Sequence, residues 1–376
     1  MAERIASAGL NARALRRYSR HLLVPEIGLQ GQERLSASRV LVVGAGGLGS
    51  PVLQYLAAAG VGRVGICDGD AVDETNLQRQ TIFATADIGR NKATAAAERL
   101  TSLNPLVAVD VIPVDLDERN ARELVRCYDV TVDCTDRFPA RYLISDACVL
   151  EGKPDVFGSI FRFDGQVSVF GTRGGPCYRC LYPEPPAADT VPTCAEGGVL
   201  GALAGIVGAW QASETLKIVV GIGETLAGRL LLIETLVARV REIRFTRDAD
   251  CAICGDRPTI ASVSAMTYND DGDGVIEEIE PAHLDSELAR ARLLDVREPH
   301  EVILGTVEGA ITMPASLLEA RMHELDSAQR YVVACRVGAK SRWAVRRLHE
   351  AGFSRLAHLR GGLLAYAAQH PDFEFY

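Results

Sequence analysis

The fold of this 376-residue chain is decided by one stretch, Arg39-Val40-Leu41-Val42-Val43-Gly44-Ala45-Gly46-Gly47-Leu48-Gly49. Its apolar first half predicts a buried strand, and a helical pattern follows the glycines at residues 48–59. A second apolar run at 64–67 ends at Asp68, nineteen residues after the last glycine. A strand, a glycine-rich turn, a helix and a strand ending in an acid predict a Rossmann-like nucleotide site.

Short apolar runs and helical patterns alternate beyond this stretch. Strands are predicted at residues 108–113, 129–133, 165–170 and 229–234, and a helix at 92–100. This alternation is typical of a parallel, doubly wound α/β sheet. In such a sheet we expect Gly44, Gly46, Gly47 and Gly49 to let backbone amides approach a phosphate at a helix N-terminus.

A dehydrogenase would fit the sequence as far as Asp68. A polar set that follows favours other chemistry, and it comprises Asp70, Asn76, Arg79, Gln80, Lys92 and Asp136. Arginine, lysine and a carboxylate able to hold Mg²⁺ suit phosphoryl or nucleotidyl transfer better than hydride transfer. Solvated surface charges would explain any one of these residues but fit the whole set poorly.

Cysteine pairs indicate a metal site. Cys177-x-x-Cys180 and Cys251-x-x-Cys254 are two knuckles that predict a closed, structural Zn²⁺ site, with unrelated thiols or redox pairs as the alternative. Cys194 lies in a proline-rich stretch before a predicted helix. A helix N-terminus makes a thiol more nucleophilic, although this cysteine would also fit an incidental place in a loop.

Bulk composition restricts the class of protein. Hydrophobic residues make up 48% and charged residues 24% of a chain long enough for two or three domains. The net charge of −9 argues against a nucleic acid partner. The uncharged residues 197–213 contain five glycines, so we expect a buried helix there and no membrane span. Ten cysteines without a signal peptide indicate a reducing, cytoplasmic location.

An acidic segment separates two units. Six acids lie between residues 269 and 280: Asp270, Asp271, Asp273, Glu277, Glu278 and Glu280. They predict a solvated, flexible linker. We therefore divide the chain into a nucleotide-binding domain at 1–256, a linker at 257–280 and a smaller α/β domain at 281–376.

The smaller domain carries a thiol in a tight loop. A predicted buried strand at 331–334 leads into Cys335-Arg336-Val337-Gly338-Ala339-Lys340-Ser341, and a helical pattern follows. Backbone N–H groups converging on the thiol, with a helix N-terminus behind it, would stabilise an anion on sulfur. Arg336 and Lys340 add positive charge. The histidines at 300, 323, 349 and 358 form no metal-binding pattern, so we expect surface or packing roles for them.

Further motifs resemble the MoeB/ThiF family, relatives of ubiquitin-activating enzymes that adenylate the C-terminal Gly-Gly of ubiquitin-fold sulfur carriers. Besides the glycine motif, they are Arg17-Tyr18-Ser19-Arg20, Gly28-Leu29-Gln30-Gly31-Gln32, Asp68-Gly69-Asp70, Asn76-Leu77-Gln78-Arg79-Gln80, Cys177-Tyr178-Arg179-Cys180 and Cys194-Ala195-Glu196-Gly197-Gly198-Val199. The resemblance covers residues 12–256 in one register. It implies an adenylation domain that uses ATP and Mg²⁺.

The same resemblance implies roles for single residues. Asp68 would contact the ribose, Asn76, Arg79 and Lys92 the phosphates, and Asp136 would support Mg²⁺ or the attacking carboxylate. Arg20 would reach into the neighbouring subunit's site, which implies a homodimer, and Cys194 would bond to the carrier. Arg137 departs from the family, which usually has Asn at this position.

The C-terminal domain resembles a rhodanese over nearly its whole length. The resemblance rests on Leu293-Leu294-Asp295-Val296-Arg297-Glu298, on Gly309-Ala310-Ile311-Thr312-Met313-Pro314, on Gly361-Gly362 and on the loop from Cys335 to Lys340, whose six residues are the sulfurtransferase length. Two residues depart from the rhodanese pattern. Lys340 stands where Arg is usual, and Tyr366 stands where a Trp often follows the Gly-Gly pair.

Together these features predict an ATP-dependent adenylyltransferase joined to a sulfurtransferase. The carrier's acyl-adenylate would meet a persulfide on Cys335, charged by a cysteine desulfurase or another donor, and give a carrier thiocarboxylate. Two alternatives stay open. The chain could activate a ubiquitin-like modifier for protein conjugation, or it could be a rhodanese on a non-catalytic scaffold.

Overall fold

The structure is a computed structural model that describes residues 10–186, 198–263, 276–303, 305–370 and 373. Within these residues the chain forms two compact units, which divide between 263 and 276. Each unit has its own sheet and its own buried core. The two are therefore described one after the other.

The first unit is built on an eight-stranded sheet in the order β3-β2-β1-β4-β5-β6-β7-β8. Its strands are β1 (Arg39–Val43), β2 (Arg63–Cys67), β3 (Ala108–Ile112), β4 (Val130–Asp133), β5 (Asp155–Phe161), β6 (Asp164–Phe170), β7 (Arg229–Glu234) and β8 (Arg239–Arg244). The pairs from β3 to β5 are parallel, which confirms the doubly wound sheet, and the pairs from β5 to β8 are antiparallel. Sequence reasoning did not find β5 or β8. Every residue of β8 is exposed, so that strand lacks the alternation that marks a half-buried one.

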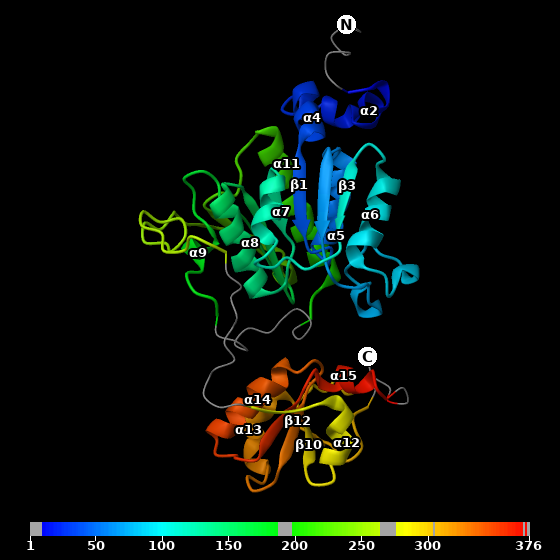
Figure 1. The fold of residues 1–376 in the computed structure, drawn as a ribbon, viewed down its shortest axis with the longest axis vertical. Helices are drawn as coiled ribbons and strands as arrows, with labels where there is room; N and C mark the ends of the chain where they lie inside the picture. The colour runs from blue at the N-terminus through cyan, green and yellow to red at the C-terminus, as the bar shows by residue number, and fades with distance from the viewer. Residues whose placement is uncertain (1–9, 187–197, 264–275, 304, 371–372, 374–376) are drawn as a thin grey trace. The chain divides into compact units, whose positions relative to one another are not determined.

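Helices cover both faces of this sheet (Figure 1). They are α2 (Ala12–Arg17), α3 (Ser19–Leu22), α4 (Gly28–Ala37), α5 (Gly49–Ala59), α6 (Lys92–Leu103), α7 (Ala121–Cys127), α8 (Phe138–Glu151), α9 (Tyr178–Leu181) and α11 (Gly201–Val220), with short 3-10 turns η1 (Glu74–Asn76), η2 (Thr85–Asp87) and η3 (Thr235–Val237). Helices α7 and α8 pack against Leu41 and Val43 of β1 in one buried cluster. Helix α11 packs tightly on α5, because a Cβ on Gly208 would lie 2.6 Å from the carbonyl oxygen of Leu48.

Helix α11 contains most of the uncharged stretch and is buried along Leu203, Ala204, Val207 and Gly208, as expected. Within the described ranges, no helix has both the length and the apolar character needed to cross a membrane.

The second unit is a five-stranded parallel sheet in the order β11-β10-β12-β13-β9. Its strands are β9 (Glu277–Ile279), β10 (Arg292–Asp295), β11 (Ile311–Thr312), β12 (Tyr331–Ala334) and β13 (Leu356–Leu359), and its helices are α12 (Leu284–Glu287), α13 (Leu318–Arg321), α14 (Ala339–Glu350) and α15 (Gly362–Ala367), with 3-10 turns η4 (Pro281–His283), η5 (Ala315–Leu317) and η6 (Met322–Glu324). The central strand β12 is fully buried and runs directly into the Cys335 loop.

The segment predicted as a linker is partly structured. Residues 264–275 lie outside the described residues. On one side of them, Ile260 packs against the cysteine knuckles of the first unit. On the other side, Glu277 and Glu278 begin β9, which pairs with β13. Glu277 also binds Arg330 at 3.0 Å. Glu277 and Glu278 are exposed, as their acidic composition suggested, but they belong to a strand, and Arg330 and Arg342 of the second unit pair with them.

Candidate functional site

The glycine motif forms a tight loop between β1 and the start of α5. Gly44 has a φ of 92°, and a Cβ there would lie 2.9 Å from the carbonyl oxygen of Cys134. Gly49 begins α5, and a Cβ there would lie only 2.1 Å from the carbonyl oxygen of Gly44. Side chains are therefore excluded from both positions, and the loop's backbone lies at the N-terminus of an eleven-residue helix. Such a loop is suited to hold an anion.

Asp68 is held against this loop at the end of β2. Its Oδ2 accepts a hydrogen bond from the amide of Ala45 at 2.7 Å, and its Oδ1 accepts one from the amide of Asp70 at 2.9 Å. Burial raises the pKa of Asp68, although the nearby Lys92 opposes this. The carboxylate is thus fixed beside the glycine loop, where an acid in a Rossmann-like site meets a ribose.

Cationic and amide side chains approach the loop from the segment after η1. A Cβ on Gly46 would lie 3.6 Å from Nε2 of Gln80, and a Cβ on Gly47 would lie 3.5 Å from Cγ of Arg79. Gln80 is 4% exposed, and its Oε1 has no hydrogen-bond partner within the described parts of the chain. An unsatisfied buried oxygen beside a ligand loop is a group that a bound molecule can satisfy.

Lys92 lies at the start of α6, and its ammonium binds Asp70 Oδ2 at 2.9 Å. The lysine side chain is 8% exposed and the aspartate side chain 69% exposed. Asn76 is the last residue of η1, and its amide donates to the hydroxyl of Thr75. Asp68, Arg79 and Gln80 therefore lie at the glycine loop, and Lys92 is connected to it through Asp70 and Asp68.

Asp136 lies after β4, in a segment that touches the glycine loop through the Cys134 carbonyl beside Gly44. Asp136 is exposed, whereas Asp133 at the end of β4 is fully buried. Burial raises the pKa of Asp133. The exposed carboxylate of Asp136 is the one that can meet a cation or an incoming substrate.

The four knuckle cysteines form one cluster. Their sulfur atoms all lie within 4.8 Å of one another. Cys177 Sγ is 3.8 Å from Cys180 Sγ and 3.5 Å from Cys251 Sγ, and Cys180 Sγ is 3.3 Å from Cys254 Sγ. Tetrahedral Zn–S bonds of about 2.3 Å would place sulfur atoms about 3.8 Å apart. The sulfur spacing therefore fits a tetrahedral metal site with no open position.

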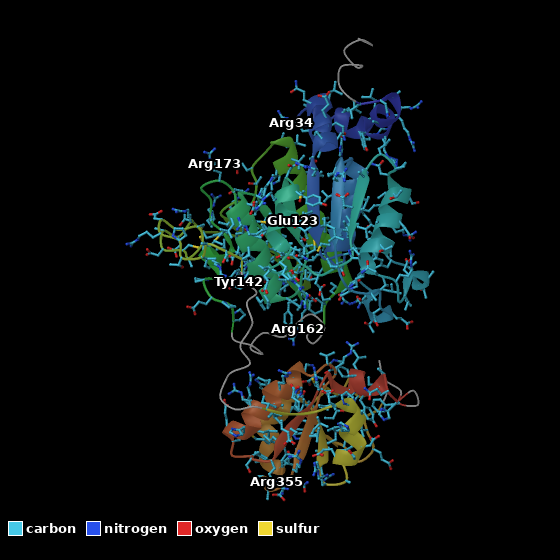
Figure 2. The ribbon with its side chains drawn as sticks, viewed as in Figure 1. Arg34, Glu123, Tyr142, Arg162, Arg173 and Arg355 are labelled. Carbon is cyan, nitrogen blue, oxygen red and sulfur yellow. The ribbon has the colours of Figure 1, made fainter. Side chains whose placement is uncertain are left out.

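The first knuckle is anchored to α8 by a buried ion pair. Arg179, between the two cysteines, donates from Nε and Nη2 to Asp146 at 2.9 Å and 2.8 Å. Its guanidinium also lies 4.8 Å from the ring centroid of Tyr142, whose place on α8 is labelled in Figure 2. This ion pair connects the four-cysteine cluster to α8, the helix that begins two residues after Asp136.

The Cys335 loop presents a buried thiol at the carboxyl end of β12. Cys335 is 1% exposed, and the amide of Gly338 donates to its Sγ at 3.1 Å. The Ser341 hydroxyl lies 3.6 Å from the same sulfur. Lys340, however, binds Glu301 at 2.9 Å, so its charge is already paired. The loop holds the sulfur with a backbone amide and a hydroxyl.

Family models match both units. The ThiF family model matches residues 18–253, and the rhodanese-like domain model matches residues 280–369. A curated relative from Mycobacterium tuberculosis, the "Probable adenylyltransferase/sulfurtransferase MoeZ", is 42% identical over 98% of this chain and 97% of its own length.

The chain belongs to the ThiF family.

Other relatives agree with this assignment. "Adenylyltransferase and sulfurtransferase MOCS3" of Bos taurus is 43% identical over 96% of this chain and 87% of its own length. "Sulfur carrier protein adenylyltransferase" of Thermus thermophilus is 53% identical over 65% of this chain and 92% of its own length. This ThiF-family chain with a rhodanese-like domain is therefore an adenylyltransferase and sulfurtransferase.

Among solved structures, Escherichia coli MccB in complex with MccA-N7isoASN has the same fold in part. Its TM-score is 0.57 at 20% identity, over 66% of this chain and 76% of that chain. At this identity the likeness concerns the fold alone.

Arg20 of this ThiF-family chain is not brought to its own glycine loop. Arg20 is exposed on α3, which precedes α4 and the amino end of β1, whereas the glycine loop follows the carboxyl end of β1 (Figure 1). Arg20 therefore lies near the amino ends of the parallel strands, whereas the glycine loop of its own chain lies at their carboxyl ends. Cys194 lies outside the described residues.

Sequence reasoning missed two residues, of which Asn91 supports the acids beside the glycine loop and Arg141 lies on α8. Asn91 donates from Nδ2 to the carbonyl oxygens of Asp68 and Asp70, at 3.1 Å and 3.2 Å. It also caps α6, and an Asn directly before a helical pattern could have revealed that role. Arg141 on α8 is 6% exposed and lies over the rings of Phe138 and Phe157. No sequence pattern marked it, because its burial depends on Phe157 of β5 as well as on Phe138 of its own helix.

The unusual Arg137 has a partner of its own. Its Nη2 lies 3.8 Å from Oδ2 of Asp115, and both side chains are mostly exposed. The substitution therefore places an ion pair beside Asp136 without removing the Asp136 carboxylate.

Proposed function

We propose that the first unit adenylates the C-terminal Gly-Gly of a ubiquitin-like sulfur-carrier protein. The observation that carries the proposal is the convergence of Arg79, Gln80 and Asp68 on a glycine loop, in a chain that also holds the Cys335 thiol. The carrier's terminal carboxylate attacks the α-phosphate of ATP, and pyrophosphate leaves. Cations around the phosphates stabilise the charge that develops, and positioning supplies much of the rate.

In this proposal each side chain has one task. Asp68, already fixed by the amide of Ala45, accepts hydrogen bonds from the ribose hydroxyls. Asn76, Arg79 and Lys92 hold the phosphates. Asp136 would hold Mg²⁺ or support the attacking carboxylate, and Mg²⁺, when bound, would neutralise phosphate charge.

The proposed enzyme is a cytoplasmic homodimer that also contains structural zinc. Because Arg20 lies at the far edge of its own sheet, it would serve the partner subunit's nucleotide site. The four-cysteine cluster would bind Zn²⁺ as thiolates and hold the segment after Cys251 on the first unit.

Sulfur transfer then passes through Cys335. A donor such as a cysteine desulfurase loads this thiol with a terminal sulfur. The Cys335 persulfide attacks the acyl-adenylate carbonyl, AMP leaves, and an acyl disulfide forms. A second thiol, for which we propose Cys194, attacks the Cys335 sulfur and releases the thiocarboxylate. The resulting disulfide is reopened by a cellular thiol reductant.

Pyrophosphate exchange tests the adenylation step. With a panel of purified carriers ending in Gly-Gly, the full chain should exchange labelled pyrophosphate into ATP only when a carrier is present. Absence of exchange with every carrier would favour a rhodanese on a non-catalytic scaffold. If the activated carrier passes to a conjugating enzyme and no thiocarboxylate forms, the chain would instead activate a ubiquitin-like modifier for protein conjugation.

The Cys335→Ala variant tests the relay. It should keep the exchange reaction and lose thiocarboxylate formation, as detected by the mass of the carrier. If the variant forms thiocarboxylate at the wild-type rate, Cys335 cannot be the residue that delivers sulfur to the carrier protein.

A further inference from the structure

A chain of polar contacts runs from the Cys335 sulfur to the edge of the second unit. Cys335 Sγ lies 3.6 Å from the hydroxyl of Ser341, and this hydroxyl lies 3.3 Å from Nδ1 of His358. The other ring nitrogen, Nε2, lies 3.1 Å from Oε1 of Glu278. Cys335, Ser341 and His358 are each no more than 1% exposed, so only the glutamate end of this relay reaches solvent.

His358 occupies an unexpected position for a polar side chain. It lies on β13 between two fully buried apolar residues, Ala357 and Leu359. Its Cε1 would be 3.6 Å from a Cβ on Gly338, whose amide donates to Cys335 Sγ. The ring therefore packs directly against the loop that holds the sulfur. A buried imidazole must be hydrogen-bonded, and here both nitrogens have partners.

The charges around the imidazole balance one another. From α14, Nε of Arg342 lies 3.2 Å from His358 Nε2, and its Nη2 donates to Glu278 Oε1 at 2.6 Å. From β9, Glu278 faces the same nitrogen, and Arg360 after β13 lies 3.9 Å from the second glutamate oxygen. Lys340 points to Glu301 instead. A neutral imidazole with its proton on Nε2 donates that proton to the Glu278 carboxylate and presents Nδ1 to the Ser341 hydroxyl as an acceptor. The carboxylate would balance the charge of a second proton taken up at Nδ1.

We propose that His358 is a positioning residue that accepts the Cys335 thiol proton through the Ser341 hydroxyl when sulfur is loaded. The Ser341 hydroxyl donates at rest to the Gly338 carbonyl oxygen at 2.8 Å. In the relay it rotates: the Ser341 oxygen takes the thiol proton, and the serine's own proton passes to Nδ1 of His358 at 3.3 Å. The Cys335 thiolate then attacks the terminal sulfur of a donor persulfide. The new S–S bond forms as the donor's S–S bond breaks, and the donor thiolate leaves with the relayed proton. No net oxidation or reduction occurs.

This inference rests on the proposed sulfur-carrying role of Cys335, but its first test does not. In the full chain, the rate of iodoacetamide alkylation at the Cys335 peptide is followed by mass spectrometry between pH 5.5 and pH 9.5. The test variant is His358→Gln, whose amide can still hydrogen-bond but cannot take up a proton. The matched control is His349→Gln, because His349 is an exposed residue of α14.

The His358→Gln variant should move the pH–rate profile to higher pH and slow alkylation at pH 7 by about a hundredfold, the lower end of the usual contribution of a positioned base. His349→Gln should match the wild type. If His358 had only a structural role, the substitution would lower the alkylation rate by the same factor at every pH, and the midpoint of the pH–rate profile would not move. That result would overturn the proposal.

Glu278→Gln supplies a second test should His358→Gln fold poorly. It keeps the hydrogen-bond geometry and removes the charge that balances the protonated ring. We expect a smaller shift in the same direction, with Glu280→Gln as control because Glu280 binds Arg360 and not the histidine. An unchanged profile would contradict the relay.

Sulfur loading separates this inference from the proposed function. In single turnover with glutathione persulfide, His358→Gln should slow formation of the Cys335 persulfide at pH 7 by the same factor as alkylation. If the wild-type chain gains no persulfide, the proposed function fails while the alkylation profile still decides the relay. If loading is as fast in His358→Gln as in the wild type, the relay fails while the proposed function stands.

Discussion

Replacing Gly49 with alanine tests whether the glycine loop holds nucleotide phosphates. Gly49 is the first residue of α5, and a Cβ there would lie 2.1 Å from the carbonyl oxygen of Gly44. Ordinary contact begins near 3.4 Å, so the loop must open by about 1.3 Å, the difference between 3.4 and 2.1 Å. The atom in the way belongs to the backbone, and no side-chain rotation can relieve the clash.

An opening of this size breaks hydrogen bonds between loop amides and a phosphate. Hydrogen bonds to charged groups contribute about 1.5–3 kcal/mol each. Loss of one of them should weaken ATP binding by about 1.5–3 kcal/mol, or roughly 10- to 150-fold in Kd. Overpacking should also lower the free energy of unfolding, by about 1–3 kcal/mol.

The assay is calorimetric titration of the full chain with ATP, alongside thermal unfolding to confirm that the variant is folded. The control is Gly205→Ala, in the interior of α11, where no atom lies within 4 Å of an added Cβ. The control should bind ATP normally and gain up to about 1 kcal/mol of stability, because alanine is the better helix former. A folded Gly49→Ala variant that binds ATP within about threefold of the wild type would refute the phosphate role of this loop.

Three further substitutions test other parts of the structure. Cys251→Ser should remove stoichiometric zinc and lower the Tm, and metal analysis that still finds one zinc per chain would contradict the four-thiolate site. Asp146→Ala should cost about 3–5 kcal/mol in urea unfolding, because it leaves the Arg179 guanidinium buried without its carboxylate, and a cost below about 1 kcal/mol would show that the pair is dispensable. Hydrogen bonding chiefly from Arg126 lowers the pKa of Glu151 from 4.5 to about 2, so its stabilisation is complete above pH 4.5 and is lost as the pH falls through 2. Glu151→Gln should therefore destabilise the chain by about 1 kcal/mol at pH 7, with the difference from wild type narrowing toward pH 2; a constant difference would count against the ion pair.

Local patterns in the sequence predicted much of the nucleotide site. The apolar run before Gly44 and the helical pattern after Gly49 are properties of neighbouring residues, and they gave β1, the loop and α5 nearly to the residue. Asp68 followed because it ends the next strand of a parallel sheet, where strand ends meet. The paired cysteine knuckles predicted their own cluster, since their side-chain chemistry admits few other uses.

Elements without a local pattern were not found. Strand β8 has no buried face, and β9 was hidden in an acidic segment whose charges are neutralised by Arg330 and Arg342, distant in sequence. The same limit applied to His358. In sequence it was one of several scattered histidines with surface or packing roles, whereas the fold buries it and connects it to Ser341 and Glu278.

The sequence by itself determined the two folds, the glycine loop, the two cysteine knuckles and the Cys335 loop, because each depends on residues that are close along the chain. The tertiary structure alone decided which charges are paired and which side chains meet. It placed Arg20 at the far edge of its own sheet, bound Lys340 to Glu301 instead of leaving it free for an anion, and aligned Glu278, His358 and Ser341 behind the sulfur. Such contacts join strands and loops that are far apart along the chain, and only the packed sheets bring them within hydrogen-bonding distance.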